Sequence, residues 1–261
     1  MRVVMLNRSG NADTNFEERL SCTHEEADTR VVLHMLDCLE RGFDVVLVDA
    51  NDTDIVVVLL YHYKLFLGNH PNCEKRKVYV RFHSYLVPIH RLCSNLPNDF
   101  VHSICLLHTL SGCDTVGFMF SKGKRVVAKA VEKWGLEKPI ALLVQEIQKS
   151  KLDPAVLEKF SVICKKVVVA SYGKDPDHFT SLNELRLHLY PRKRELKYLP
   201  PSDAAFECHA KRVYLQLDIF LQANRAKPQF LDPLQFGWMF QDGGVRPVVS
   251  TLQAFPEGVV P

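Results

Sequence analysis

The chain has 261 residues, of which 47% are hydrophobic, and its formal net charge is +3. This length suffices for a substantial hydrophobic core and is compatible with one domain plus an extension. The small net charge does not by itself predict a nucleic-acid partner, so that argument must come from local clusters. The longest apolar run, residues 55–67, contains His62 and Lys64 and is shorter than the ~20 residues of a membrane span, so we expect no membrane association.

The eight cysteines form no Cys-x-x-Cys pair, and most of them lie inside apolar runs, as small hydrophobic residues do. This distribution favours a reduced compartment and a protein without structural zinc. The apolar stretch at residues 1–6 is too short for a secretory signal peptide. We therefore expect a nuclear or cytoplasmic protein.

The beginning of the chain predicts a short remnant followed by a helix. Residues 1–22 hold a brief apolar stretch and a polar loop, which we interpret as an N-terminal remnant. Thr23 and Glu26 have the spacing of a capping box, which predicts a helix that starts at His24 and ends at Gly42.

A short β-branched run follows this helix at residues 44–49. Such runs are typical of strands that are buried on both faces of a parallel sheet. The strand would place Asp49, Asp52 and Asp54 at its carboxyl end, where open α/β sheets bind their ligands. Residues 55–63 fit a buried helix or a strand, and we predict a helix.

The rest of the chain is predicted to be mainly helical. The expected elements are a strand at 76–83, a helix that begins at Pro88, and helices at 99–110, 141–149 and 154–164. Ser202 predicts the N-cap of a C-terminal helix that runs through Phe220. We expect residues 232–261 to form an extended tail anchored by Trp238.

Residues 121–135 combine a turn at Gly123 with a basic helix. Backbone amides at a helix N-terminus, together with neighbouring lysines, bind phosphate groups regardless of nucleotide sequence. The alternative is that the basic residues are only the solvated face of a helix. The same alternatives apply to the basic run at residues 191–194, which is either a localisation signal or solvated.

Three short acidic motifs precede this basic segment. They are Glu26-Ala27-Asp28, Asp52-Thr53-Asp54 and Gly112-Cys113-Asp114. In order and spacing the set resembles the PIN-like superfamily of 5′-nucleases and flap endonucleases, over residues 23–135. The stretches 24–30 and 112–115 are also similar to a multicopy, largely uncharacterised group of animal proteins, which implies an association with mobile elements.

The resemblance implies an α/β fold in which helices flank a parallel sheet. Residues 23–170 would form the PIN-like domain, with a helix-hairpin-helix-like segment at 121–135, and residues 171–261 would form a C-terminal helix and tail. The implied activity is that of a metal-dependent phosphodiesterase acting on nucleic acid with one or two Mg²⁺ or Mn²⁺ ions, which prefer carboxylate oxygens as ligands. The implied metal ligands are Glu26, Asp28, Asp52, Asp54 and Asp114, of which Asp52, Asp54 and Asp114 are the implied catalytic residues. The implied nucleic-acid contacts are Lys122, Gly123, Lys124, Arg125 and Lys129.

The chain departs from the superfamily before the first motif. Members carry two further metal-binding aspartates on strands that precede the Glu-Ala-Asp helix, whereas only Asp13, in a polar loop, precedes Thr23 here. We therefore expect that the chain is a fragment of a longer product or that it has lost cleavage. Three functions stay open: an active phosphodiesterase, a nucleic-acid-binding module without cleavage, and a protein-interaction domain that keeps the fold.

The acidic residues also allow a purely structural interpretation, because carboxylates in these motifs can cap helices or hold a turn without binding a metal. Glu25 and Asp49 are predicted to be solvated or to support the metal ligands indirectly. The histidines lie on apolar faces, where core histidines are the commoner outcome. Cys113 lacks the sequence context of a nucleophile and is predicted to be a small buried residue.

Overall fold

The structure is a computed structural model that describes residues 2–3, 20–73, 75–192 and 195–250. It divides the chain into two compact units. The first unit comprises Met1–Cys105 and Ile219–Phe230, and the second comprises Leu106–Asp218 and Leu231–Pro261. The boundary predicted at residue 170 does not coincide with this division, because the residues on both sides of it belong to the second unit.

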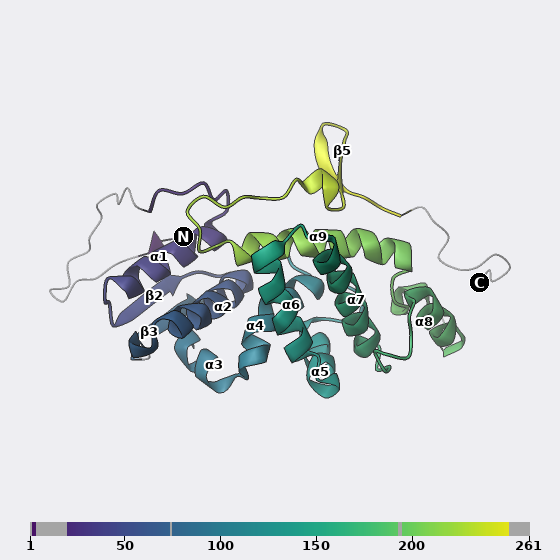
Figure 1. Cartoon of the computed structure of the whole chain (residues 1–261), viewed down its shortest axis with the longest axis horizontal. Helices are drawn as coiled ribbons and strands as arrows, with labels where there is room; N and C mark the ends of the chain where they lie inside the picture. Colours follow the sequence, from purple (N-terminus) through teal and green to yellow (C-terminus); the bar gives the residue numbers. More distant parts are fainter. Residues whose placement is uncertain (1, 4–19, 74, 193–194, 251–261) are drawn as a thin grey trace. The chain divides into compact units, whose positions relative to one another are not determined.

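The protein is an α/β protein in which helices predominate over the described residues (Figure 1). The helices are α1 (Ala27–Glu40), α2 (Thr53–Asn69), α3 (Ile89–Asn95), α4 (Asn98–Leu110), α5 (Lys124–Trp134), α6 (Glu137–Ser150), α7 (Pro154–Ser171), α8 (Leu182–Leu189) and α9 (Asp203–Leu221). The strands are β1 (Arg2–Val3), β2 (Val45–Asp49), β3 (Lys77–Phe82), β4 (Tyr85–Pro88), β5 (Trp238–Gln241) and β6 (Gly244–Pro247). Short 3-10 helices are η2 (Pro71–Cys73), η3 (Tyr190–Arg192), η4 (Leu196–Tyr198) and η5 (Pro233–Gln235). Across these described elements, no helix combines the length and the apolar character that a membrane crossing requires.

The sheet of the first unit has the order β1-β2-β3-β4 and is mixed. Only β2 and β3 pair in parallel, whereas β1 and β4 pair with their neighbours antiparallel. The prediction of a parallel sheet was therefore wrong in this respect. The cause lies at His83 and Ser84, which join β3 directly to β4, because such a two-residue connection permits only antiparallel pairing.

One face of this sheet is buried and the other is open. Val46, Val48, Val78 and Val80 are buried, while α1 packs against β2 and α3 packs against β3. On β2 the alternate residues are exposed, Val45 by 57% and Leu47 by 42%. The prediction that this strand is buried on both faces was thus wrong, since helices in the described part of the first unit cover only one side.

The first helix starts later than predicted. α1 begins at Ala27, its N-cap is Glu26, and no side chain caps it. Thr23 does not form a capping box, because its backbone N–H donates to the carbonyl oxygen of Ala226 at 3.0 Å. This pairing with a distant segment of the same unit keeps the chain extended where the local pattern predicted a helical turn.

The helix predicted after the second acidic motif is confirmed. α2 starts at Thr53, and the side chain of Asp52 accepts a hydrogen bond from the backbone N–H of Asp54 at 2.8 Å. Although its β-branched residues favour strands, α2 is 17 residues long, which is longer than an ordinary strand. The predicted strand at residues 76–83 is also confirmed, as β3.

Over its described residues, the second unit consists of helices and the β5–β6 hairpin. α5 starts after Gly123 and ends at Gly135, whose φ of +63° is the left-handed conformation that glycine favours. α5 and α6 each pack against α7. The side chain of Ser202 accepts from the N–H of Ala205 at 3.3 Å, which confirms the N-terminus predicted for α9.

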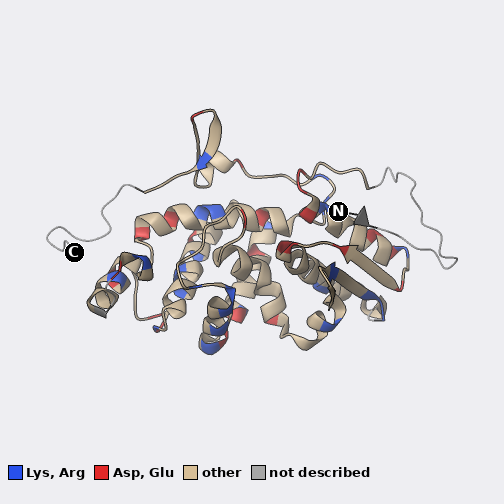
Figure 2. Cartoon of the chain, turned by 180° about the vertical axis from the view of Figure 1, so that it is seen from behind, with Lys and Arg blue, Asp and Glu red and all other residues tan. Residues whose placement is uncertain are grey.

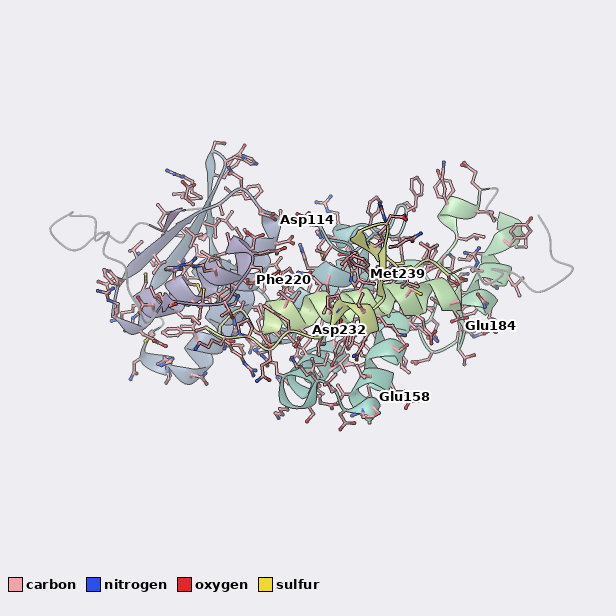
Figure 3. The ribbon with its side chains drawn as sticks, turned by 90° about the horizontal axis from the view of Figure 1, so that it is seen from above. Asp114, Glu158, Glu184, Phe220, Asp232 and Met239 are labelled. Carbon is pink, nitrogen blue, oxygen red and sulfur yellow. The ribbon has the colours of Figure 1, made fainter. Side chains whose placement is uncertain are left out.

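The C-terminal region was predicted as an extended tail, but residues 238–247 form the β5–β6 hairpin. Asp242 and Gly243 have positive φ values of 52° and 77°, as in the tight turn that joins two antiparallel strands. The base of the hairpin is held by Arg212 of α9, whose Nη1 donates to the Gly237 carbonyl oxygen at 3.1 Å and to the Val248 carbonyl oxygen at 3.2 Å. Figure 3 labels Met239 on this hairpin, beside α9.

Candidate functional site

A pocket of about 680 Å³ lies at the carboxyl end of β2 in the first unit. Its lining residues come from the start of α1, the end of β2 and the start of α2: Ala27, Asp28, Asp49, Ala50, Asn51, Asp52 and Ile55. We call it the acidic pocket, since three of its lining residues are aspartates. Two helix N-termini therefore meet the end of a strand here, as expected for a ligand site in an open α/β sheet.

Asp52 has a structural role that is compatible with ligand binding. Its Oδ1 accepts the hydrogen bond that caps α2, and the residue is half-buried. A capping carboxylate interacts favourably with the positive end of the helix dipole. One oxygen is thus used for capping, while Asp52 still lines the acidic pocket.

Asp49 is engaged by Arg81 at the equivalent end of β3. The two residues are partners in the parallel register, and Arg81 Nε donates to Asp49 Oδ1 at 2.9 Å, with a second bond from Nη2 to Oδ2. These hydrogen bonds, together with the charge of the guanidinium, lower the pKa of Asp49 below its usual value. The pair reduces the negative charge that the pocket would otherwise concentrate.

The connection between β2 and α2 is fixed by two hydrogen bonds to the end of β3. The backbone N–H of Ala50 donates to the Arg81 carbonyl oxygen at 3.1 Å, and the backbone N–H of His83 donates to Asn51 Oδ1 at 2.9 Å. These bonds tie Ala50 and Asn51, which line the acidic pocket, to the end of β3.

The structure brings some of the predicted metal ligands together. Asp28 and Asp52 both line the acidic pocket. Glu26 is the exposed N-cap of α1, and Asp54 lies in the first turn of α2, but neither lines the pocket. Asp114 belongs to the second unit, so its convergence with the other carboxylates stays a prediction.

Within the described residues, no group of three or more His, Cys, Asp or Glu side chains stands close enough to hold a metal ion. Asp49 is paired with Arg81, and the other two carboxylates that line the pocket are those of Asp28 and Asp52. Two carboxylates are too few for a two-metal pair, whereas a single Mg²⁺ ion can retain water ligands where protein ligands are few. The metal itself stays a prediction.

The Gly-Cys-Asp element forms a tight turn in the second unit. The backbones of Cys113 and Val116 exchange hydrogen bonds of 3.0 and 3.1 Å, with Asp114 exposed between them. Gly112 has a φ of +106°, and an added Cβ would lie 2.6 Å from the Cβ of Phe118. The glycine is therefore required by the turn itself, and Figure 3 labels the neighbouring Asp114.

The basic segment is only partly available to a ligand. Lys124 Nζ donates to the Gly112 carbonyl oxygen, and Lys122 Nζ lies 4.4 Å from the centre of the Tyr172 ring. Arg125 and Lys129 are exposed on α5, where Figure 2 marks Lys and Arg in blue. The turn and the basic helix are confirmed, and the helix-hairpin-helix-like function stays a prediction.

The histidines behave as core residues where the structure buries them. His62 is 1% exposed and its Nε2 donates to the Phe220 carbonyl oxygen at 2.9 Å, within the first unit. His209, in the second unit, has its Nε2 3.4 Å from the Leu110 carbonyl oxygen. Burial lowers the pKa of each ring to about 4, so both are neutral at physiological pH.

Two features of the site were missed from the sequence. Asp49 was expected to be solvated or to support the metal ligands indirectly, and its ion pair with Arg81 was not predicted. The sequence carries little signal for this pair, because it depends on the register of β2 and β3. The exposed aromatic residues at Phe118 and Phe120 were also overlooked, although their spacing is visible in the sequence.

Comparisons of the chain with protein-family models, curated proteins and solved structures found no match.

Proposed function

We propose that the chain is a nucleic-acid-processing domain of PIN-like type, whose acidic pocket binds one Mg²⁺ or Mn²⁺ ion weakly. The observation that carries this proposal is the acidic pocket itself. It places Asp28 and Asp52 at the carboxyl end of β2, next to the N-termini of α1 and α2. Carboxylates supply the oxygen ligands that hard divalent cations prefer, and helix N-termini attract phosphate groups.

Each group of the pocket has a separate part in this proposal. Asp28 and Asp52 would hold the ion, which would polarise a phosphoryl oxygen and acidify a bound water molecule. The amide groups at the two helix N-termini orient the phosphate. Arg81 keeps Asp49 ionised and in place at the edge of the pocket. Because only two carboxylates are assigned to the ion, we expect weak cleavage.

The substitution Asp52→Asn tests the metal site cleanly. Asparagine caps helices about as well as aspartate does, so α2 is retained while the charged ligand is lost. We expect Mn²⁺ affinity, measured by calorimetry, to fall at least about tenfold, with the free energy of unfolding changed by less than about 0.5 kcal/mol. Any cleavage of a labelled single-stranded or flap oligonucleotide should be abolished by EDTA and by Asp52→Asn.

Asp153→Asn is the matched control, because Asp153 caps α7 through the N–H of Ala155 at 2.9 Å and does not line the acidic pocket. It should leave Mn²⁺ affinity unchanged. Equal Mn²⁺ affinity of the wild type and Asp52→Asn would contradict the assignment of the pocket as a metal site.

A second candidate function is a nucleic-acid-binding module without cleavage. It is favoured by the Asp49–Arg81 pair, which partly neutralises the pocket without a metal. Under this alternative, oligonucleotide binding would be insensitive to EDTA and cleavage would be absent at every Mn²⁺ concentration tested.

A further inference from the structure

Two positive charges lie around one tyrosine in the second unit, outside the lining of the acidic pocket. Tyr172 is the C-cap of α7, which packs against α5 and α8 (Figure 1). The ammonium nitrogen of Lys122 lies 4.4 Å from the centre of the Tyr172 ring, and the guanidinium of Arg186 interacts electrostatically with the Tyr172 hydroxyl. We call Tyr172, Arg186 and Lys122 the tyrosine cluster.

The hydroxyl group of Tyr172 is a buried donor. It forms no hydrogen bond with any part of the chain that the structure describes. Burial raises the pKa of Tyr172 to about 12, although the Arg186 guanidinium opposes this shift, so the hydroxyl is protonated at physiological pH. A buried donor without an acceptor costs free energy, because it has lost its hydrogen bonds to water. An acceptor that reaches this hydroxyl would therefore be held firmly.

Arg186 contributes a buried positive charge from α8. The residue is only 7% exposed, and its Nη1 donates to the carbonyl oxygen of Pro200. Burial lowers the pKa of Arg186, and the nearby Tyr172 opposes this shift. A guanidinium nevertheless stays protonated in proteins, and it presents several N–H donors in one plane. Because water is excluded here, an anion beside Arg186 would be attracted more strongly than at the surface.

Lys122 contributes the second positive charge from the loop before α5. The preceding residue, Ser121, has a φ of +60°, which residues other than glycine rarely adopt. The backbone N–H of Lys122 donates to the carbonyl oxygen of Met119 at 3.0 Å. This turn fixes the backbone of Lys122, while the ammonium group is carried on a flexible four-carbon stem that adjusts to a ligand.

We propose that the tyrosine cluster binds a phosphate group, either as inorganic phosphate or as the terminal phosphate of a small monoester. The Tyr172 hydroxyl donates to one phosphate oxygen, and Arg186 and Lys122 form charge-assisted hydrogen bonds with the others. The inference goes beyond the proposed function, because it requires neither the acidic pocket nor a metal ion.

The donors of the cluster favour a phosphate monoester over other acceptors. Tyr172, Arg186 and Lys122 all donate, and a phosphate monoester offers three strong acceptor oxygens, whereas a carboxylate offers two. The phosphodiester of a nucleic-acid strand has only two free oxygens and continues in both directions, which does not suit a buried hydroxyl and a buried guanidinium. A water molecule would accept from the hydroxyl but would not neutralise Arg186.

The test is equilibrium dialysis of the full chain against radiolabelled inorganic phosphate. EDTA is present, so that no metal ion at the acidic pocket contributes. We expect saturable binding, and we expect Tyr172→Phe to weaken it about tenfold, because this change removes one hydrogen bond to a charged group and keeps the ring. Tyr63→Phe is the matched control, since Tyr63 is also buried but its hydroxyl donates to the Arg76 carbonyl oxygen at 2.7 Å in the first unit. It should leave phosphate affinity unchanged.

Substitutions of the two cations test the remaining contacts. Arg186→Lys keeps a positive charge and a donor for Pro200 but loses the planar set of donors, so phosphate affinity should fall about tenfold. Lys122→Gln should weaken binding severalfold, whereas Lys129→Gln, at an exposed position of α5, should leave it unchanged. Circular dichroism shows whether each variant is folded. Tyr172→Phe keeps the inference testable if Arg186→Lys unfolds, because it removes only a hydroxyl group.

Competition experiments identify the source of the phosphate group. Displacement of the labelled phosphate by phenyl phosphate would assign the cluster to monoesters, and its absence would assign the cluster to inorganic phosphate. Three results would overturn the inference. They are the absence of saturable binding, equal phosphate affinity of the wild type and Tyr172→Phe, and displacement of phosphate by acetate or by an oligothymidine with hydroxyl ends at the concentrations at which unlabelled phosphate displaces it.

Discussion

Lowering the pH should destabilise the first unit through one buried histidine. His62 of α2 is 1% exposed and donates to the carbonyl oxygen of Phe220, which the end of α9 contributes to the same unit. Burial disfavours the charged imidazolium and lowers the pKa of His62 to about 4, although the Phe220 carbonyl opposes the shift. In the unfolded chain the pKa returns to its ordinary value of 6.5.

Between pH 6.5 and pH 4 the unfolded chain therefore binds a proton that the folded chain excludes. The free energy of unfolding must fall as the pH is lowered through this window. With these two pKa values, the loss between pH 7.5 and pH 5 is about 2 kcal/mol for this residue. That is a large part of the ~5–15 kcal/mol typical of folded domains.

The assay is urea unfolding, followed by circular dichroism, of the wild type and His62→Gln at pH 7.5 and pH 5. Glutamine retains an N–H donor for the Phe220 carbonyl but does not titrate, so the variant should lose about 2 kcal/mol less than the wild type on acidification. His178→Gln, at an exposed position, should behave as the wild type does. An identical pH dependence of the wild type and His62→Gln would refute this account of the buried ring.

Two other substitutions probe the second unit. Lys151→Met should lower the free energy of unfolding, measured in urea, by about 3 kcal/mol. The reason is that the buried carboxylate of Asp218, 3.1 Å from Lys151 Nζ, would lose this cation. The control Lys159→Met breaks an exposed pair with Glu146 and should lower the free energy of unfolding by less than about 1 kcal/mol. Gly237→Ala should loosen the β5–β6 hairpin and speed its limited proteolysis, because an added Cβ would lie 2.6 Å from the Cys208 carbonyl oxygen. The control Gly243→Ala has a similar φ but open space around it, so it should incur only the backbone cost of ~1–2 kcal/mol. Equal proteolysis of the two variants would show that the Gly237 contact does not hold the hairpin.

Elements with strong local signals were predictable from the sequence. The N-termini of α2 and α9 follow from Asp52 and Ser202, whose side chains cap the helices that come after them. The hairpin was missed although its signal is local, because Asp242-Gly243 is a strong turn sequence between two apolar strands. The start of α1 was not predictable in this way, since Thr23 bonds to Ala226, far away in the chain.

In the acidic pocket, too, features that follow from local sequence patterns were predictable, and features that depend on distant segments were not. Asp28 and Asp52 could be placed together because both follow from one helix–strand–helix pattern. The Asp49–Arg81 pair depends on the register of β2 and β3, which the hydrophobic pattern does not specify. Whether one face of β2 is exposed depends on where the helices pack. The apolar residues of β2 form the same sequence pattern whether one face or both faces are buried.

The discontinuous first unit has a consequence for synthesis of the chain on the ribosome. Residues up to Cys105 emerge first, but the partners of Thr23 and His62 lie within Ile219–Phe230. At ~5–20 residues per second, translation of the intervening segment takes roughly 6–23 s. During that interval the nascent first unit lacks part of its own core, so chaperones that shield apolar surface would meet it before its last segment arrives.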